Sequence, residues 1–210
     1  MVIDPAVIKP AIESYNRIAL TASYHVSYHL PALYGMDSIW QFQENISGII
    51  VMGSAASVHD GHKWQDDITD LLLESFDKSI PVMGICYGHQ LLAHICGGRV
   101  GPLWNGKKEQ GQRKVSVMEN SLWGKARNGQ MIYSHQDGVT QCPDDFEITA
   151  VSDMVSVDGL VSKTKPIWGF QTHIEATQAF IDNHNIPIAN HQETFAFGHQ
   201  ILDSFILSLA

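Results

Sequence analysis

The sequence predicts an α/β protein, a three-layer sandwich in which helices flank a mainly parallel central sheet with a small antiparallel extension. In the first half, short apolar runs alternate with segments of helical periodicity, which is typical of a parallel sheet covered on both faces. In the second half, short strand-like runs follow one another between turn-forming residues, which favours antiparallel pairing. The chain has 210 residues and shows no linker, repeat or low-complexity segment. We therefore expect a single domain over residues 1–210.

The charge and cysteine content exclude several classes of protein. The formal net charge is −9 and no cluster of lysine and arginine offsets it, which argues against a nucleic-acid partner. The three cysteines have no framework spacing and suggest a reducing compartment. The N-terminus lacks the pattern of a signal peptide, and no run approaches the roughly 18 apolar residues that a membrane span needs. We expect a soluble, cytoplasmic protein without a membrane partner.

The first half of the chain contains the predicted parallel strands and their helices. Pro10 occupies a favoured first-turn position, so it predicts a helix with Ile12, Tyr15, Ile18 and Ala19 on one face. A later short helix has Asp37 or Ser38 as its candidate N-cap. The predicted elements are strands at 2–4, 24–33, 49–52 and 80–85, and helices from Pro10, at 39–44, at 66–76 and after residue 86.

The second half contains short strands and one long helix. Asn128-Gly129 and Asp158-Gly159 are turn signals that separate or interrupt the strands. The last helix should cover 193–209, because Phe197, Ile201, Phe205 and Leu209 recur every fourth residue. The predicted strands lie around Val100 and at 115–117, 131–133, 146–151, 155–161 and 166–171.

The run G-I-C-Y-G-H-Q at residues 84–90 joins a predicted strand to a predicted helix. A cysteine between two glycines at such a junction has the form of a nucleophile elbow, in which the glycines allow a sharp turn and close backbone approach. The thiol of Cys86 would lie at a helix N-terminus, where partial positive charge favours the reactive thiolate. The alternative interpretation is a buried apolar thiol without reactivity.

A second candidate segment is Q-T-H-I-E at residues 171–175, which follows another predicted strand. In an open parallel sheet, active residues gather at the carboxyl ends of the strands, where Cys86 and the loop after 49–52 should also lie. In extended chain His173 and Glu175 point to the same side, so the carboxylate can orient the imidazole that accepts a thiol proton. The alternatives are a strand-end histidine with no chemical role and an acid that stabilises a helix N-terminus.

These two runs resemble the class I (triad-type) glutamine amidotransferases, whose patterns are G-[IV]-C-x-G-[HM]-Q and [QG]-x-H-P-E. The resemblance covers nearly the whole chain and extends to the loop after residue 52 and to residues 108–111. The run S-H-Q-D at 134–137 is most similar to the S-H-x-D pattern in the amidotransferase domain of GMP synthetase. The resemblance implies the flavodoxin-like α/β fold of that family.

The resemblance also implies residue roles. Cys86 would attack the side-chain amide of glutamine, giving a γ-glutamyl thioester and ammonia, with His173 as base and then acid and Glu175 orienting it. Backbone N–H groups of Gly53, Ser54 and Tyr87 would form the oxyanion hole. Gln90 would help to hold the glutamine substrate, and backbone around Gln136 and Asp137 would recognise its α-amino and α-carboxylate groups. Without the family, Gln90 would be interpreted as a surface amide and residues 136–137 as a solvated turn.

The sequence departs from the family pattern at two positions near these groups. Ser54 stands where the oxyanion loop usually has a second glycine, so its φ is restricted and the loop can rest in another conformation. Ile174 replaces the usual proline between histidine and glutamate, which frees a φ angle and an N–H. Residues 184–191 have no family counterpart and are interpreted as a surface insertion.

Three functional hypotheses remain open. The first is a glutamine amidotransferase or glutaminase-type hydrolase that releases ammonia, with a separate synthetase or ammonia-acceptor subunit as its partner. The second is a stand-alone γ-glutamyl hydrolase that acts on a γ-glutamylated amine or nucleotide. The third is a catalytically silent binding or regulatory subunit. We expect no cofactor and no metal, because the eleven histidines show no recognised ligand spacing.

Overall fold

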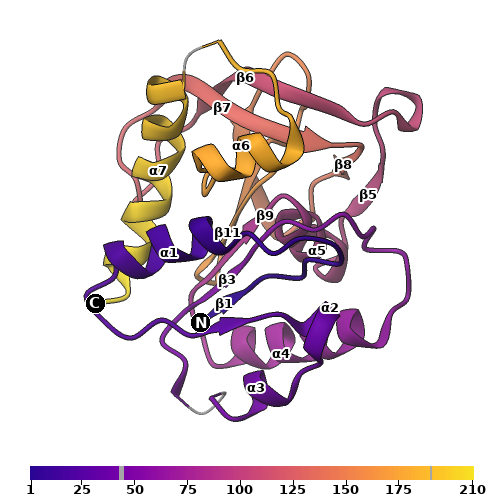
Figure 1. Ribbon diagram of the computed structural model, residues 1–210, viewed down its shortest axis with the longest axis vertical. Helices are drawn as coiled ribbons and strands as arrows, with labels where there is room; N and C mark the ends of the chain where they lie inside the picture. Colours follow the sequence, from indigo (N-terminus) through magenta and orange to yellow (C-terminus); the bar gives the residue numbers. More distant parts are fainter. Residues whose placement is uncertain (43–44, 190) are drawn as a thin grey trace.

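The computed structural model describes residues 1–42, 45–189 and 191–210, and one nine-stranded sheet runs through this part of the chain (Figure 1). The sheet is parallel from β2 to β11. This parallel part has the spatial order β2 (Tyr28–His29), β1 (Val2–Ile3), β3 (Ile49–Val51), β4 (Val82–Ile85) and β11 (Ile167–Phe170).

The second half of the chain continues the same sheet with antiparallel strands beyond β11. They follow in the order β10 (Gly159–Ser162), β9 (Phe146–Val151), β6 (Glu109–Val117) and β7 (Arg127–His135). A separate two-stranded sheet pairs β5 (Arg99–Pro102) with β8 (Asp137–Gln141). The predicted α/β sandwich with a parallel sheet and an antiparallel extension is confirmed.

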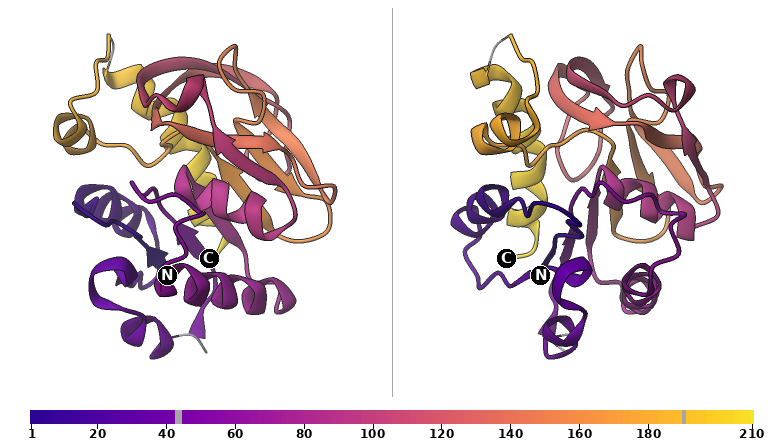
Figure 2. Two further views of the ribbon diagram at one scale, coloured as in Figure 1. Left: turned by 90° about the vertical axis from the view of Figure 1, so that its right-hand side faces the viewer. Right: turned by 45° about the vertical axis from the view of Figure 1, so that its right-hand side comes forward.

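Helices cover both faces of the sheet (Figure 2). On one face, α1 (Ile12–Thr21) and α7 (His191–Ser208) pack on the sheet through buried side chains such as Ile18 and Phe205. On the other, α4 (Lys63–Asp77) and α5 (Tyr87–Ile95) bury Leu72 and Leu92. The described short helices are α2 (Pro31–Tyr34), α3 (Asp37–Trp40), the 3-10 helix η2 (Trp104–Gly106) and α6 (Gln178–His184).

Two glycines let α5 lie directly against the central strands. A Cβ on Gly88 would lie 2.2 Å from the carbonyl oxygen of Val51 in β3. A Cβ on Gly84 would lie 2.5 Å from the backbone of Gly88 itself. The two glycines of the elbow therefore allow the close backbone approach that the sequence predicted.

Several predicted boundaries in the first half are wrong. The strand expected at 24–33 is limited to Tyr28–His29, because Pro31 begins α2 at a helix position that needs no N–H. The helix expected at 39–44 is α3, which starts at Asp37 after an N-cap at Met36, and residues 43–44 lie outside the described residues. The helix expected from Pro10 begins at Ile12, whose side chain is exposed.

In the second half, Asn128-Gly129 does not form a turn but lies inside β7. The glycine is needed for packing, since a Cβ there would lie 2.2 Å from the ring of Phe197 on α7. The strand expected at 155–161 begins only at Gly159. Gln136 is an exposed bend between β7 and β8, and β8 begins at Asp137.

The segment 184–191, expected as a surface insertion, is partly buried. It follows α6, a helix that the sequence did not predict, whose N-cap Thr177 accepts a hydrogen bond from the N–H of Phe180. Ile186 is buried against Phe180, Ile181 and Ile132, and residue 190 lies outside the described residues. In the described part of the chain, none of the helices has the length and apolar character that crossing a membrane requires.

Candidate active site

Cys86 lies at the junction of β4 and α5 in a backbone conformation that side chains rarely adopt. Its φ is 51° and its ψ is −100°, and it is the N-cap residue of α5. Its N–H donates to the carbonyl oxygen of Phe170 at 2.8 Å, which continues the pairing of β4 with β11. The thiol therefore lies at the N-terminus of a helix, where the helix dipole favours a negative charge. Strained backbone of this kind is typical of functional residues.

His173 and Glu175 follow β11 and are both buried. Their side chains meet directly, with His173 Nδ1 2.8 Å from Glu175 Oε1. Burial alone would lower the pKa of His173, but the negative charges of Glu175 and of the Cys86 thiolate raise it to about 10. The imidazole therefore holds a proton at neutral pH.

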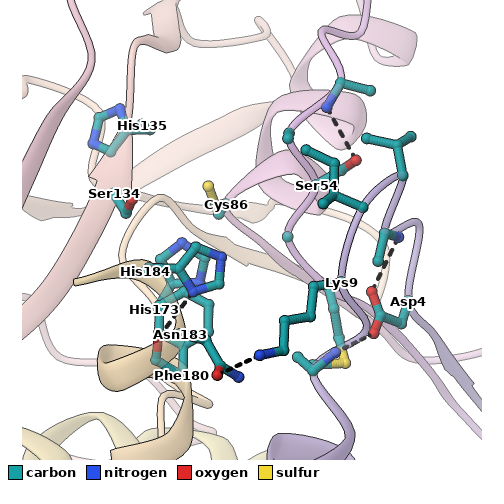
Figure 3. Close-up of a pocket in the computed structure, with 18 of the residues that line it drawn as sticks. Asp4, Lys9, Ser54, Cys86, Ser134, His135, His173, Phe180, Asn183 and His184 are labelled. Atoms are coloured by element: carbon teal, nitrogen blue, oxygen red, sulfur yellow. Dashed lines mark hydrogen bonds between the residues drawn. The ribbon is translucent and has the colours of Figure 1, made fainter. Parts of the chain in front are cut away.

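Cys86, His173 and Glu175 line a cavity of about 480 Å³, within the usual range of about 300–1,000 Å³ for small-molecule pockets. Figure 3 shows the cysteine sulfur and the histidine ring in this cavity. On one side the wall is the segment that connects β1 to α1, and α6 forms another part of it. The two are joined where Lys9 Nζ donates to Asn183 Oδ1 at 2.6 Å.

Gly53, predicted as part of the oxyanion hole, follows β3 and lies against both reacting groups. A Cβ at this position would lie 2.8 Å from His173 Cε1 and 3.6 Å from the Cβ of Cys86. The chain thus has room for His173 only because residue 53 has no side chain.

We expect Gly53→Ala to reduce catalytic turnover about 10²-fold, because the added methyl group displaces the His173 ring, and a misplacement near 1 Å can have an effect of that size. The protein should still fold, since the side chain that must move faces a cavity. The measurement is steady-state turnover with thermal unfolding as a check. Gly101→Ala is the control, because its Cβ would meet nothing closer than 3.9 Å. Equal turnover in the two variants would contradict the expectation.

Ser54 does not strain the loop, as the sequence had suggested it could. It is not among the described non-glycine residues with positive φ. Its hydroxyl donates to the carbonyl oxygen of Pro5 at 2.6 Å and accepts from the N–H of Ala56 at 3.1 Å. The serine therefore fastens the loop after β3 to the cavity wall that follows β1.

Ile174 has the N–H that a proline at this position would lack. Its N–H donates to the carbonyl oxygen of Thr172 at 3.1 Å. The side chain is fully buried, and α7 passes so close that a Cβ on Gly198 would lie 3.0 Å from the Cα of Ile174.

Tyr87, the third predicted member of the oxyanion hole, is the first residue of α5 and is fully buried. An N–H in the first turn of a helix has no partner within the helix, so it can bind an external oxygen. The phenol lies away from this N–H in a hydrogen bond from Gln65 Nε2 at 3.0 Å. The side chain of Tyr87 is therefore held in place through its hydroxyl group.

The three predicted substrate-binding residues lie together on the cavity wall. Gln90 is buried, not the surface amide that its helix position alone suggested, and its Nε2 donates to the carbonyl oxygen of Asp137 at 2.8 Å. The carboxylate of Asp137 accepts from the hydroxyl of Ser57 at 3.2 Å. Gln136 is exposed, and its carbonyl oxygen accepts from Leu103 N.

A buried polar network behind residues 136–137 was not predicted. Arg113 on β6 forms a buried ion pair with Asp158 and a hydrogen bond of 2.9 Å with His135 Nε2. Because Arg113 can only donate, His135 Nε2 accepts and Nδ1–H donates to the carbonyl oxygen of Asp137 at 2.8 Å. Burial, and then the charge of Arg113, lower the pKa of His135 to about 3. This histidine is neutral.

Phe180 on α6 is a second cavity residue that the sequence did not indicate. Its ring centroid lies 4.4 Å from that of His173 and 4.4 Å from that of His184. Phe180 therefore packs against the His173 ring and lines the cavity with it.

Within the described chain, no group of three or more histidine, cysteine or acidic side chains is arranged to hold a metal ion.

A cysteine at a strand–helix elbow, with an imidazole and a carboxylate just after the neighbouring parallel strand, defines an α/β protein of the cysteine–histidine–carboxylate triad type. The model of one family, Glutamine amidotransferase class-I, matches residues 12–187. The chain belongs to the class I glutamine amidotransferase family.

Curated relatives are named GMP synthase [glutamine-hydrolyzing]. The protein of Ligilactobacillus salivarius is 38% identical over 135 residues, which covers 62% of this chain and 25% of the relative. That of Borreliella burgdorferi is 33% identical over 168 residues, which covers 79% of this chain and 28% of the relative. The chain thus spans about a quarter of the length of these relatives.

Solved structures share the fold at lower identity. A glutamine amido transferase from Methylobacillus flagellatus has a TM-score of 0.79 at 17% identity, covering 99% of this chain and 92% of its own. A glutamine amidotransferase from Thermotoga maritima has a TM-score of 0.73 at 18% identity, covering 100% and 97%. These similarities confirm the predicted fold.

Proposed function

We propose that this chain hydrolyses the side-chain amide of glutamine through a thioester on Cys86. The observation that carries the proposal is the contact of His173 with Glu175 next to the Cys86 thiol, on the wall of a cavity large enough for a small molecule. Family membership supports it, as do relatives whose names include glutamine hydrolysis.

The reaction has two halves in this proposal. The Cys86 thiolate attacks the amide carbon, and His173 gives its proton to the nitrogen, so the C–N bond breaks and ammonia leaves. Water then attacks the thioester, His173 accepts a proton from that water, and the C–S bond breaks to release glutamate. Glu175 keeps the imidazole oriented and stabilises its charge.

The remaining cavity residues have supporting roles. The N–H groups of Gly53, Ser54 and Tyr87 form the oxyanion hole, which is worth about 2.7–4 kcal/mol for each donor. Asp137 binds the α-ammonium group with its carboxylate, since its carbonyl oxygen already accepts from Gln90 and His135. Gln90 therefore shapes the substrate site through Asp137, and Gln136 contributes at the rim.

We further propose that residues 1–210 act as one amidotransferase unit whose ammonia passes to a separate synthetase partner. The support is that the named relatives are about four times longer than the matched segment. The proposed chemistry in the cavity does not consume ammonia, so the ammonia is available to such a partner.

A time course with glutamine and with γ-glutamyl amides tests the function. We expect ammonia and glutamate in equal amounts from glutamine. A glutamine-analogue electrophile should label Cys86, identified by peptide mass. If glutamine is untouched while another γ-glutamyl compound is cleaved, the chain is instead a γ-glutamyl hydrolase. If no compound is cleaved and Cys86 is not labelled, even with a synthetase partner, the chain is a silent binding subunit.

A further inference from the structure

Gln171 contacts the cysteine sulfur from the interior of the protein. It follows β11 directly, is fully buried and does not line the cavity. Its Nε2 lies 3.7 Å from the sulfur of Cys86, a distance suited to an acceptor as large as sulfur. The preceding residue, Phe170, accepts the backbone N–H of Cys86 at 2.8 Å, so the two chain segments are held at a fixed separation.

The neighbouring hydrogen bonds determine which end of the Gln171 amide faces the sulfur. A backbone carbonyl can only accept, so the group of Gln90 that lies 2.8 Å from the carbonyl oxygen of Asp137 must be Nε2. The same Nε2 lies 3.3 Å from Gln171, where it must meet the oxygen of that amide. The other end of the Gln171 amide, which faces the sulfur, is therefore the donor Nε2.

The acceptor that orients Gln90 is itself fixed. The carbonyl oxygen of Asp137 also receives the Nδ1–H of His135, whose Nε2 is occupied by Arg113. Arg113 donates to His135, which donates to the carbonyl oxygen of Asp137. Gln90 donates to that same oxygen and to the amide oxygen of Gln171, and Gln171 donates to the sulfur of Cys86. A reversal of either amide would place two acceptors or two donors face to face inside the protein, which costs about 1–3 kcal/mol for each unsatisfied group.

We propose that Gln171 is a positioning residue that donates an N–H to the sulfur of Cys86 and favours its thiolate form. The proposal rests on the function proposed above only in taking Cys86 as the nucleophile. The sulfur carries negative charge twice in the cycle, before it attacks the amide and again when the C–S bond of the thioester breaks. Gln171 stabilises that charge both times and, being unable to titrate, does not exchange protons with His173.

The test uses the pH dependence of Cys86 alkylation by chloroacetamide, measured by site-resolved peptide mass from about pH 5 to about pH 10. Gln171→Met keeps the length of the side chain and removes the donor. Gln171→Glu keeps an acceptor for Gln90 and places a negative charge at the sulfur. The titratable groups that line the cavity with Cys86 stay unchanged in both variants; they are Asp4, Lys9, Lys108, His135, Asp137, His173, Glu175 and His184.

For Gln171→Met we expect the midpoint of the pH–rate profile to move up by about one unit, because hydrogen bonds to charged groups have effects of this size. At pH values well below the midpoint, alkylation should then be about tenfold slower. For Gln171→Glu the midpoint should move further. The limiting rate at high pH should stay within about twofold of wild type. Thr172→Val is the matched control, since its buried hydroxyl donates to Met131 Sδ at 2.9 Å and Thr172 does not line the cavity.

Two results would overturn the proposal. One is a profile with the wild-type midpoint in both Gln171 variants. The other is slowing by the same factor at every pH, which would indicate a purely structural effect. The reagent needs no glutamine, so the outcome is separate from the proposed function. If the midpoint moves while the wild type releases no ammonia from any γ-glutamyl compound, the role of Gln171 holds and the proposed function fails.

Discussion

Cys86→Ala is expected to lower ammonia release from glutamine by about 10⁴-fold or more, because loss of a triad nucleophile leaves only the contribution of binding and the oxyanion hole. The fold should be unaffected. Alanine carries the same Cβ as cysteine, so the positive φ of 51° at this position costs no more than before. The measurement is a coupled ammonia assay, with thermal unfolding as the check on folding.

The chain offers a matched control at the other end of the same helix. Cys96 is the C-cap residue of α5, and burial raises the pKa of its thiol to about 11. Its thiolate is therefore scarce at neutral pH, and Cys96→Ala should keep wild-type turnover. Comparable losses in both variants, or residual turnover of a tenth in Cys86→Ala, would remove Cys86 from the reaction.

Arg113→Met is expected to lower the free energy of unfolding by about 3–5 kcal/mol, the usual effect of leaving one member of a buried ion pair without its partner. Arg113 and Asp158 are both buried, and the guanidinium also lies 4.7 Å from the ring centroid of Tyr133. Burial raises the pKa of Asp158, and Arg113 opposes this. Without Arg113 the carboxyl would have to be buried as an unpaired charge or take up a proton. Urea unfolding near pH 7 measures the loss.

Two further variants make this expectation specific. Adding Asp158→Asn to Arg113→Met should recover a large part of the lost stability, since the unpaired charge is then gone. Arg17 pairs with Asp203 at 2.7 Å near the surface, so Arg17→Met should cost at most about 1 kcal/mol. Equal losses in the free energy of unfolding for Arg113→Met and Arg17→Met would show that the buried ion pair contributes no more to stability than the surface pair.

The parts of the fold that follow from local pattern were predictable from the sequence. An apolar run of strand length before Cys86 and helical spacing after it determined β4, the elbow and α5 within a residue or two. The proximity of His173 to Glu175 followed from their spacing of two residues. Their position next to Cys86 followed from the rule that parallel strands present active residues at their carboxyl ends.

The parts that depend on distant contacts were not predictable. Gly129 was interpreted as a turn residue, yet it is needed because a side chain there would collide with the ring of Phe197 on α7. Asp158 was assigned to a turn signal because its partner Arg113 lies 45 residues earlier in the chain. The helix α6 was missed since a run of seven residues with a single buried pair has too little periodicity to distinguish it from a loop.

The strand β11 belongs to both halves of the sheet, because it pairs in parallel with β4 and antiparallel with β10. The nucleophile and its base therefore follow two adjacent hydrogen-bonded strands, in which Ile85 is in register with Phe170. Moving the backbone of Cys86 away from Phe170 would require breaking the centre of the sheet, and core strands generally open only with global unfolding. The backbone that carries the nucleophile should therefore stay in place for as long as the protein stays folded.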